Sequence, residues 1–110
     1  MREGVGERGV VATLCGARPG KTVALRADFD ALAIQELNDV PYKSKNDGVM
    51  HACGHDGHTA TLLVLAKVLT DMREQLTGNI VFIHQHAEEV SPGGAKAMIA
   101  DGCLDGVDVI

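Results

Sequence analysis

The chain has 110 residues, which suits one small domain, and its 45% hydrophobic and 23% charged residues are typical of a globular protein. The net charge of −5 argues against nucleic-acid binding, because phosphate binding needs a basic face. The longest apolar run, Leu62 to Ala66, is too short to span a membrane, and no charged-then-apolar leader signals secretion.

Two strands and a long loop are predicted in the first half of the chain. Residues 10–14 form a short β-branched run, and residues 22–27 form a second one. Pro19 and Gly20 between them suit the centre of a type II turn, so the two runs are predicted to pair as a hairpin. Residues 28–49 are polar and irregular, which predicts a long loop of the kind that often carries function.

A long helix is predicted next, from about Gly57–Thr59 to Met72 or Leu76, with Asp56 as its N-cap. Apolar side chains cover most of its circumference, so we expect it to be largely buried. These side chains are Leu62, Leu63, Ala66, Val68 and Leu69.

The second half continues the alternation of strands and helices. Residues 80–83 form an unbroken apolar run, as expected for a central strand covered on both faces. A short helix follows, with Ala95 and Met98 on one face and Gly102 as its stop. Residues 107–110 open another strand, and the sequence ends within it, which suggests a fragment. The order predicts an α/β protein with a mixed sheet.

The three cysteines are an odd number at wide spacing, which does not indicate a disulfide framework. We therefore expect a reducing, cytoplasmic setting. Most cysteines in that setting are small buried apolar residues, and we expect this of Cys15 and Cys103. Cys53 differs, because it lies among histidines.

Polar residues are concentrated at the ends of the predicted elements. Asp28 and Asp30 follow the second strand, and Glu88 and Glu89 follow the central strand. Ligands of open α/β sheets bind beyond the carboxyl ends of the strands, so these groups are predicted to face one site. Taken singly, the aspartates are equally well explained as turn residues, and the glutamates as a solvated pair.

The segment 51–58 reads HACGHDGH and precedes the long helix. Imidazole and thiolate bind borderline metals such as zinc, and the glycine between Cys53 and His55 lets both reach one ion. No Cys-x-x-Cys pair is present to form a zinc finger. A hydrolytic metal also needs a carboxylate to take a proton from water. Glu88 and Glu89 supply both roles if an extended backbone points them different ways.

Three segments carry a family resemblance: residues 25–32 (LRADFDAL), 50–58 (MHACGHDGH) and 87–89 (AEE). They resemble the amidohydrolase branch of the aminoacylase/carboxypeptidase metallopeptidase family, which includes hippurate hydrolase, N-acyl-amino-acid deacylases and auxin-conjugate hydrolases. The resemblance implies the truncated N-terminal part of a mixed-sheet α/β/α catalytic domain of zinc-peptidase-like fold, without the second, dimerisation domain. It also implies hydrolysis of the amide bond of N-acyl amino acids, with no nucleic-acid or membrane partner and a possible homodimer.

The resemblance further implies two divalent ions, zinc or manganese, with Cys53, His55 and Glu89 as ligands. It gives Glu88 the role of general base and gives Asp30 a supporting role through hydrogen bonds. Further ligand histidines are expected beyond residue 110.

Two positions depart from the family pattern. Asp28 replaces a histidine ligand of related peptidases, so its role is open, and His86 replaces a frequent proline, either as a polar contact or as a tolerated change. The alternative from another functional class is a truncated, non-catalytic remnant that binds metal weakly or binds a protein partner. Hydrolysis that is lost on chelation distinguishes the enzyme from the remnant.

Overall fold

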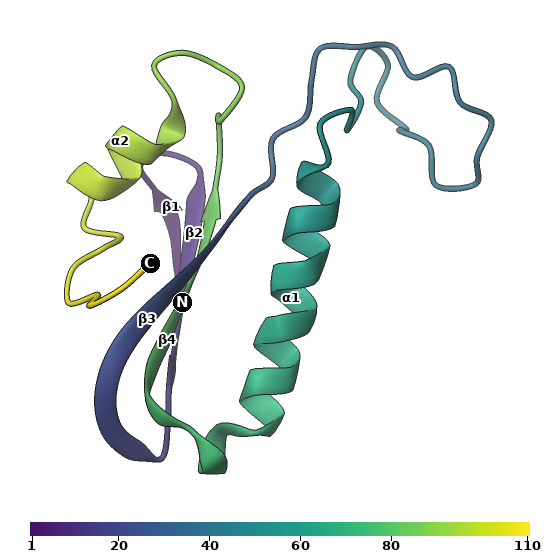
Figure 1. The fold of residues 1–110 in the computed structure, drawn as a ribbon. Coiled ribbons are helices and arrows are strands. Elements are labelled where there is room, and N and C mark those ends of the chain that lie inside the picture. Colours follow the sequence, from purple (N-terminus) through teal and green to yellow (C-terminus); the bar gives the residue numbers. More distant parts are fainter.

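The structure, a computed structural model, describes all 110 residues as a four-stranded sheet with one helix on each face (Figure 1). The strands are β1 (Arg2–Val5), β2 (Gly9–Cys15), β3 (Arg18–Asp28) and β4 (Thr77–Gln85). The helices are α1 (His55–Asp71) and α2 (Gly94–Ala100), and a 3₁₀ turn occupies Arg73–Gln75. The predicted α/β class with a mixed sheet is confirmed.

β4 occupies the centre of the sheet, whose strand order is β1-β2-β4-β3. It pairs antiparallel with β2 and parallel with β3. The central strand predicted over residues 80–83 is therefore confirmed. The hairpin predicted between residues 10–14 and 22–27 is wrong, because β4 lies between β2 and β3.

The chain between β2 and β3 passes around the start of β4 and does not make a tight turn. The Gly16 amide donates to the Gly78 carbonyl at 2.9 Å, and the Ala17 amide donates to the Leu76 carbonyl at 3.1 Å. Gly20 lies within β3 and is not among the residues with the positive φ that a type II turn requires. Gly78 has φ +85°, and a Cβ atom there would collide with the Lys21 carbonyl oxygen.

β1 is an edge strand that the sequence analysis did not predict. It pairs antiparallel with β2 through a turn in which Gly6 and Glu7 have φ of 58° and 88°. Three of its four residues are exposed, so it carries no alternating apolar pattern. Because strands are predicted from alternating apolar residues, β1 could not be recognised in the sequence.

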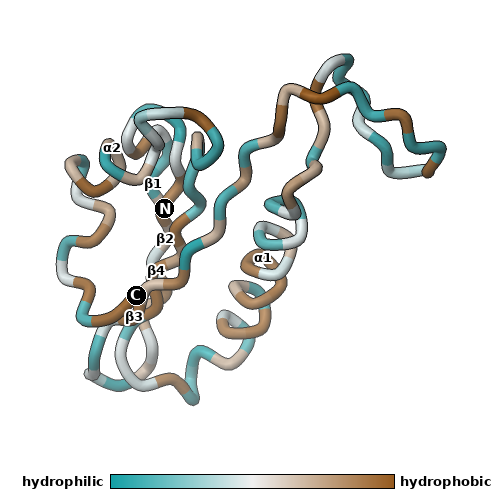
Figure 2. The backbone as a smooth tube through the Cα atoms, turned by 45° about the horizontal axis from the view of Figure 1, so that its top comes forward, coloured by the Kyte–Doolittle hydropathy of each residue, from teal (hydrophilic) through white to brown (hydrophobic).

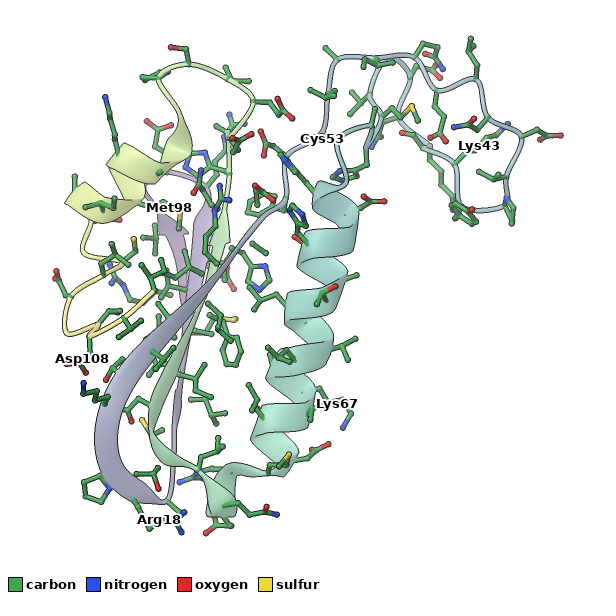
Figure 3. All side chains as sticks on the ribbon, in the orientation of Figure 1. Arg18, Lys43, Cys53, Lys67, Met98 and Asp108 are labelled. Carbon is green, nitrogen blue, oxygen red and sulfur yellow. The ribbon has the colours of Figure 1, made fainter.

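The core is divided between the two faces of the sheet because alternate residues of β4 point to opposite sides. On the α2 side, Met98 and Val5 are each 1% exposed and pack with Val81 and Ile83. Met98 is labelled in Figure 3 between α2 and the sheet. On the α1 side the buried residues are Ala27, Leu62 and Phe82.

α1 begins two residues earlier than predicted, at His55. Its N-cap is Gly54, with φ 101°, and no side chain caps the helix. Asp56 lies in the first turn, so its predicted role as N-cap is wrong. Its negative charge still lies near the positive end of the helix dipole, which is favourable.

Most of α1 is exposed, and the prediction that it is largely buried is wrong. Only His55 and Leu62 are buried, whereas Leu63 and Val64 are 57% and 65% exposed. The helix contacts the sheet along one side only, and Figure 2 shows hydrophobic residues along much of its length. Neither helix is long and apolar enough to cross a lipid bilayer.

The C-terminal residues lie beside β3 and pair with it through a single β-bridge. Of the strand predicted over residues 107–110, Val109 alone makes a bridge, parallel to Val23 of β3. The Asp108 carboxylate accepts a hydrogen bond from the Thr22 amide at 2.7 Å. The outer edge of β3 beyond this point has no neighbouring strand.

The cysteine predictions are only partly correct. All three thiols are free, and Cys103 is buried as expected. Cys15 is exposed, so its predicted burial is wrong: it is the last residue of β2, beyond the packed part of that strand.

The predicted long loop is confirmed. It runs from the end of β3 to the start of α1 and extends beyond the end of the sheet (Figure 1). One antiparallel bridge, between Leu32 and Met50, joins its two arms. The loop therefore leaves the sheet beside the polar end of β3 and returns at the histidine-rich segment.

Candidate functional site

Three segments meet where β3 and β4 end and α1 begins. Because β3 and β4 are parallel, their carboxyl ends lie at the same edge of the sheet. Asp28 pairs with Gln85 in this register, so Asp30 and the Glu88–Glu89 pair follow at nearby positions. Cys53 lies at the junction of the long loop and α1 (Figure 3). The structure thus brings together the three polar clusters.

His55 is the central residue of this site. It is only 3% exposed, and its Nδ1 atom lies 3.1 Å from the Asp30 carbonyl oxygen and 3.2 Å from Asp30 Oδ1. Both neighbours are acceptors, so Nδ1 carries the proton and donates it. When the ring is neutral, the lone pair of Nε2 therefore faces the open side of the site.

Three carboxylates lie around that nitrogen, and the nearest is Asp28, whose Oδ2 atom is 3.5 Å from His55 Nε2. The Nε2 atom of His55 lies 3.8 Å from Glu88 Oε2 and 3.9 Å from Glu89 Oε1. We expected Glu88 and Glu89 to diverge because of an extended backbone, and this reason is wrong. β4 ends at Gln85 and Ala87 has φ +50°, so the backbone turns and both carboxylates face His55.

Cys53, His55 and Glu89 form a group that fits a metal ion. Their ligand atoms (one thiol sulfur, one imidazole nitrogen and one carboxylate oxygen) all lie within 4.8 Å of one another. Zinc and related divalent ions accept this combination of donors. Asp28, His55 and His58 form a second group whose ligand atoms also lie within 4.8 Å of one another.

Asp30 joins two sides of the site. Its Oδ1 atom accepts from His55, and its Oδ2 atom accepts a hydrogen bond from the Glu89 backbone amide at 2.9 Å. One carboxylate therefore holds both the imidazole and the segment that carries Glu89. This geometry agrees with a supporting role for Asp30.

The carboxylates of the site shift the pKa values of Cys53 and His55. The hydrogen bond and charge of Glu89 raise the pKa of the Cys53 thiol above its usual value. Burial lowers the pKa of His55, but the charges of Asp28 and Asp30 outweigh burial, so the net shift is upward. A cation bound at the site would therefore compete with a proton at each of these two groups.

Asp28 shows the opposite behaviour. Burial of its carboxyl group raises its pKa, but the hydrogen bond from His58 and the charge of Arg26 outweigh burial, so the net pKa is lowered. His58 Nδ1 lies 2.7 Å from Asp28 Oδ1, and Arg26 Nη1 lies 2.9 Å from Oδ2. Asp28 is therefore ionised and held between two donors.

His86 lies outside the site. It is 9% exposed, and its Nε2 atom donates to the Gly6 carbonyl oxygen at 2.7 Å. It therefore links the end of β4 to the turn between β1 and β2. Of the two interpretations left open by the sequence, the structure supports an added polar contact.

The contacts of His58 and Arg26 were not predicted from the sequence. His58 follows His55 by three residues, so in a helix the two side chains lie on one face. Arg26 precedes Asp28 by two residues, so in a strand both point to the same side. These two spacings are the signals from which the contacts were predictable.

The metal-donor group faces an open surface. The largest cavity, of about 600 Å³, lies within the long loop and is lined by residues such as Glu36, Tyr42 and His51. Cys53, His55, Glu88 and Glu89 do not line it. The 110 residues thus supply metal donors but no enclosed pocket around them.

Comparison with known proteins agrees with the site. A Bacillus subtilis protein provisionally named an amidohydrolase, YhaA, is 66% identical over 110 residues, which cover 100% of this chain and 28% of that protein. N-acyl-L-amino acid amidohydrolase of Geobacillus stearothermophilus is 57% identical over 101 residues, covering 92% of this chain and 27% of that enzyme. The chain thus spans little more than a quarter of the length of these relatives.

The fold is similar to a solved structure of the same kind. The Bacillus subtilis YXEP protein, described as a dinuclear metal binding peptidase from the M20 family, superposes with a TM-score of 0.89 at 44% identity. The match covers 97% of this chain and 30% of that one. Residues 24–110 also match the model of peptidase family M20/M25/M40, and the chain therefore belongs to this family of hydrolases.

Proposed function

We propose that this chain is the N-terminal part of the metal-binding catalytic domain of an amidohydrolase that cleaves the amide bond of N-acyl amino acids. The observation that carries the proposal is the convergence of Cys53, His55 and Glu89 within 4.8 Å, with Glu88 beside them. The activity of the relative from Geobacillus stearothermophilus supports the substrate class. The three free cysteines support a cytoplasmic location.

Cys53, His55 and Glu89 would hold the ion, and Asp30 would keep the His55 ring in the tautomer that binds through Nε2. A divalent ion at this position supplies polarisation of the substrate carbonyl group and acidification of water. The family relative with two ions supports a dinuclear site, with zinc or manganese as the expected metals.

Glu88 would act as the general base. Its carboxylate takes a proton from the attacking water as the oxygen–carbon bond forms, and it then gives that proton to the departing amine as the carbon–nitrogen bond breaks. Its side chain is 44% exposed and lies on the open side of His55, where a water molecule and a substrate have access. The products are a carboxylic acid and a free amino acid.

The remaining metal ligands would come from the rest of the protein, which would also contain the dimerisation domain. Val109 pairs in parallel with Val23, and a strand continuing in that register along the free edge of β3 runs toward Asp28. It would deliver its own side chains to the edge of the sheet that carries the metal donors. This path supports the expectation of a ligand histidine just past residue 110.

The test is hydrolysis of a panel of N-acyl amino acids by the protein purified from its source cells, before and after chelation. We expect activity that chelation removes and that zinc or manganese restores. Intact mass is measured on the same sample. A native species of 11.6 kDa without hydrolase activity would contradict the proposal and would favour the non-catalytic remnant.

A further inference from the structure

A buried ionic network lies directly beside the proposed metal donors, and the proposed function makes no use of it. Asp28 is buried, with 4% of its side chain exposed. Its Oδ1 atom accepts a hydrogen bond from His58 Nδ1 at 2.7 Å, and its Oδ2 atom pairs with Arg26 Nη1 at 2.9 Å. His55 Nε2 lies 3.5 Å from the same Oδ2 atom. The network therefore contacts the central residue of the site.

The network is itself fixed to three elements. Arg26 Nε donates to the Gln85 side chain at the end of β4 at 3.0 Å. Thr59 Oγ1, in the first turns of α1, donates to the Asp28 carbonyl oxygen at 2.9 Å. These contacts tie the ends of β3 and β4 to the N-terminal end of α1. These hydrogen bonds and the Arg26–Asp28 ion pair therefore hold the start of α1, which carries His55, against the ends of β3 and β4.

His58 also contacts the ring of His55. The two ring centroids are 5.7 Å apart and the planes are inclined by 26°, which is a stacked arrangement. Asp30 holds His55 at its Nδ1 edge, whereas His58 supports its face. The position of His58 depends in turn on Asp28.

A ligand role for Asp28 itself is disfavoured by charge. A cation bound at Oδ2 would lie close to the Arg26 guanidinium group, which is already 2.9 Å from that oxygen. Like charges at such a distance repel each other. Oδ1 is occupied by the short hydrogen bond from His58.

We propose that His58 is a positioning residue for His55: anchored by Asp28 and Arg26, its ring fixes the orientation in which His55 presents Nε2 to the metal. This inference rests on the proposed role of His55 as a ligand. It assigns a structural reason to an aspartate at a position where related peptidases carry a histidine. His58 itself does not bind the ion.

The test uses cobalt binding to the full-length protein, because a cobalt–thiolate site has an absorption spectrum that reports ligand geometry. We expect His58→Leu to weaken cobalt binding about 10–100-fold and to shift the visible bands, with the number of bound ions unchanged. His58→Asn places an amide N–H near the position of Nδ1 and should recover part of the affinity. The His58 side chain is 62% exposed, so neither variant opens a core cavity.

His51→Leu is the matched control, because His51 belongs to the same segment but is exposed and contacts none of these groups. It should bind cobalt as the unmodified protein does. Wild-type affinity and spectrum in His58→Leu would overturn the inference, and so would the loss of one bound ion, which would make His58 a ligand. Failure of the unmodified protein to show a cobalt–thiolate spectrum would instead refute the proposed function. If His58→Leu does not fold, the comparison of His58→Asn with the unmodified protein applies the same criteria.

Discussion

Glu88 and Glu89 are adjacent in sequence but differ in their hydrogen bonds and in the exposure of their side chains. The Glu89 backbone amide is bonded to Asp30 Oδ2 at 2.9 Å, and its side chain is 25% exposed. The Glu88 side chain is 44% exposed and makes no hydrogen bond to another side chain. The anchored backbone and lower exposure of Glu89 suit a metal ligand, whereas the greater exposure of Glu88 suits a group that exchanges a proton with water and substrate.

Replacing Glu88 by Gln in the full-length protein tests this difference. Glutamine keeps the shape of the side chain but cannot accept a proton, so we expect kcat to fall by about 10²–10⁴-fold with metal content unchanged. Turnover and elemental analysis of one preparation give both quantities. Glu74→Gln, an exposed position in the 3₁₀ turn, is the control and should change neither. Retained turnover in Glu88→Gln would remove this residue from the mechanism.

Cys53→Ser tests the thiol as a ligand. A serine hydroxyl is a poor metal donor at neutral pH, so affinity should fall by more than the roughly 10–100-fold expected for the loss of an outer partner. The metal content after dialysis against a weak chelator measures this loss. Cys15→Ser removes a second exposed thiol outside the site and should retain full occupancy. Equal occupancy in both variants would contradict the assignment.

Metal binding should weaken in acid, because the ion replaces protons on His55 and Cys53. Both groups have raised pKa values in the metal-free chain, so each must release a proton before it binds. We therefore expect the apparent zinc affinity to fall as the pH is lowered from about 8 to about 6. Competition titrations with a chromophoric chelator measure the trend. An affinity independent of pH over this range would show that neither group is a ligand.

The residues of the site were more predictable than their contacts. The polar clusters were predicted to face one site because ligands of α/β sheets bind beyond the carboxyl ends of the strands. The choice of Cys53, His55 and Glu89 as ligands came from the family resemblance, and their ligand atoms do lie within 4.8 Å of one another. The contact between His58 and Asp28 was missed because the helix was expected to begin after His55. The three-residue spacing of the two histidines places them on one face only if the helix begins at His55, as it does.

At the scale of elements, apolar content predicted the central strand and both helices, but not which strands pair. β2 pairs with β4 across a separation of some sixty residues, from Cys15 to Thr77, and no local pattern specifies that partner. The Pro19-Gly20 pair favoured a local hairpin. Instead, the chain between β2 and β3 crosses the start of β4, where the Gly16 amide donates to the Gly78 carbonyl oxygen. The burial of α1 was overestimated because one helix side alone contacts the sheet.

The crossing at Gly78 gives a prediction with an internal control. Gly78 and Gly48 have similar positive φ angles, 85° and 73°, but a Cβ atom at Gly78 collides with Lys21, whereas nothing lies within 4 Å at Gly48. Gly48→Ala should cost only the conformational penalty of about 1–2 kcal/mol. Gly78→Ala adds the collision and should cost clearly more. Chemical denaturation of both variants measures the difference, and equal costs would show that the crossing tolerates a side chain.

At the scale of the whole molecule, α1 leaves several large apolar side chains on the surface. Leu63, Val64 and Val68 are 57%, 65% and 45% exposed on one helix. A contiguous apolar surface of this kind promotes association in water. We expect the 110-residue chain, prepared alone, to self-associate. Val64→Lys should reduce that association in light scattering, whereas Lys67→Arg on the same helix should not.

The central position of β4 has a consequence for protein synthesis. β1, β2 and β3 leave the ribosome before Thr77, so the sheet cannot close until β4 emerges. At about 5–20 residues per second, the delay from Cys15 to Thr77 is about 3 to 12 s. During that time β2 and β3 have no native neighbour between them, and their open edges are available to other nascent chains or to a chaperone. Of the four strands of this sheet, β4 is made last and lies between β2 and β3, so the pairing of both strands depends on its emergence.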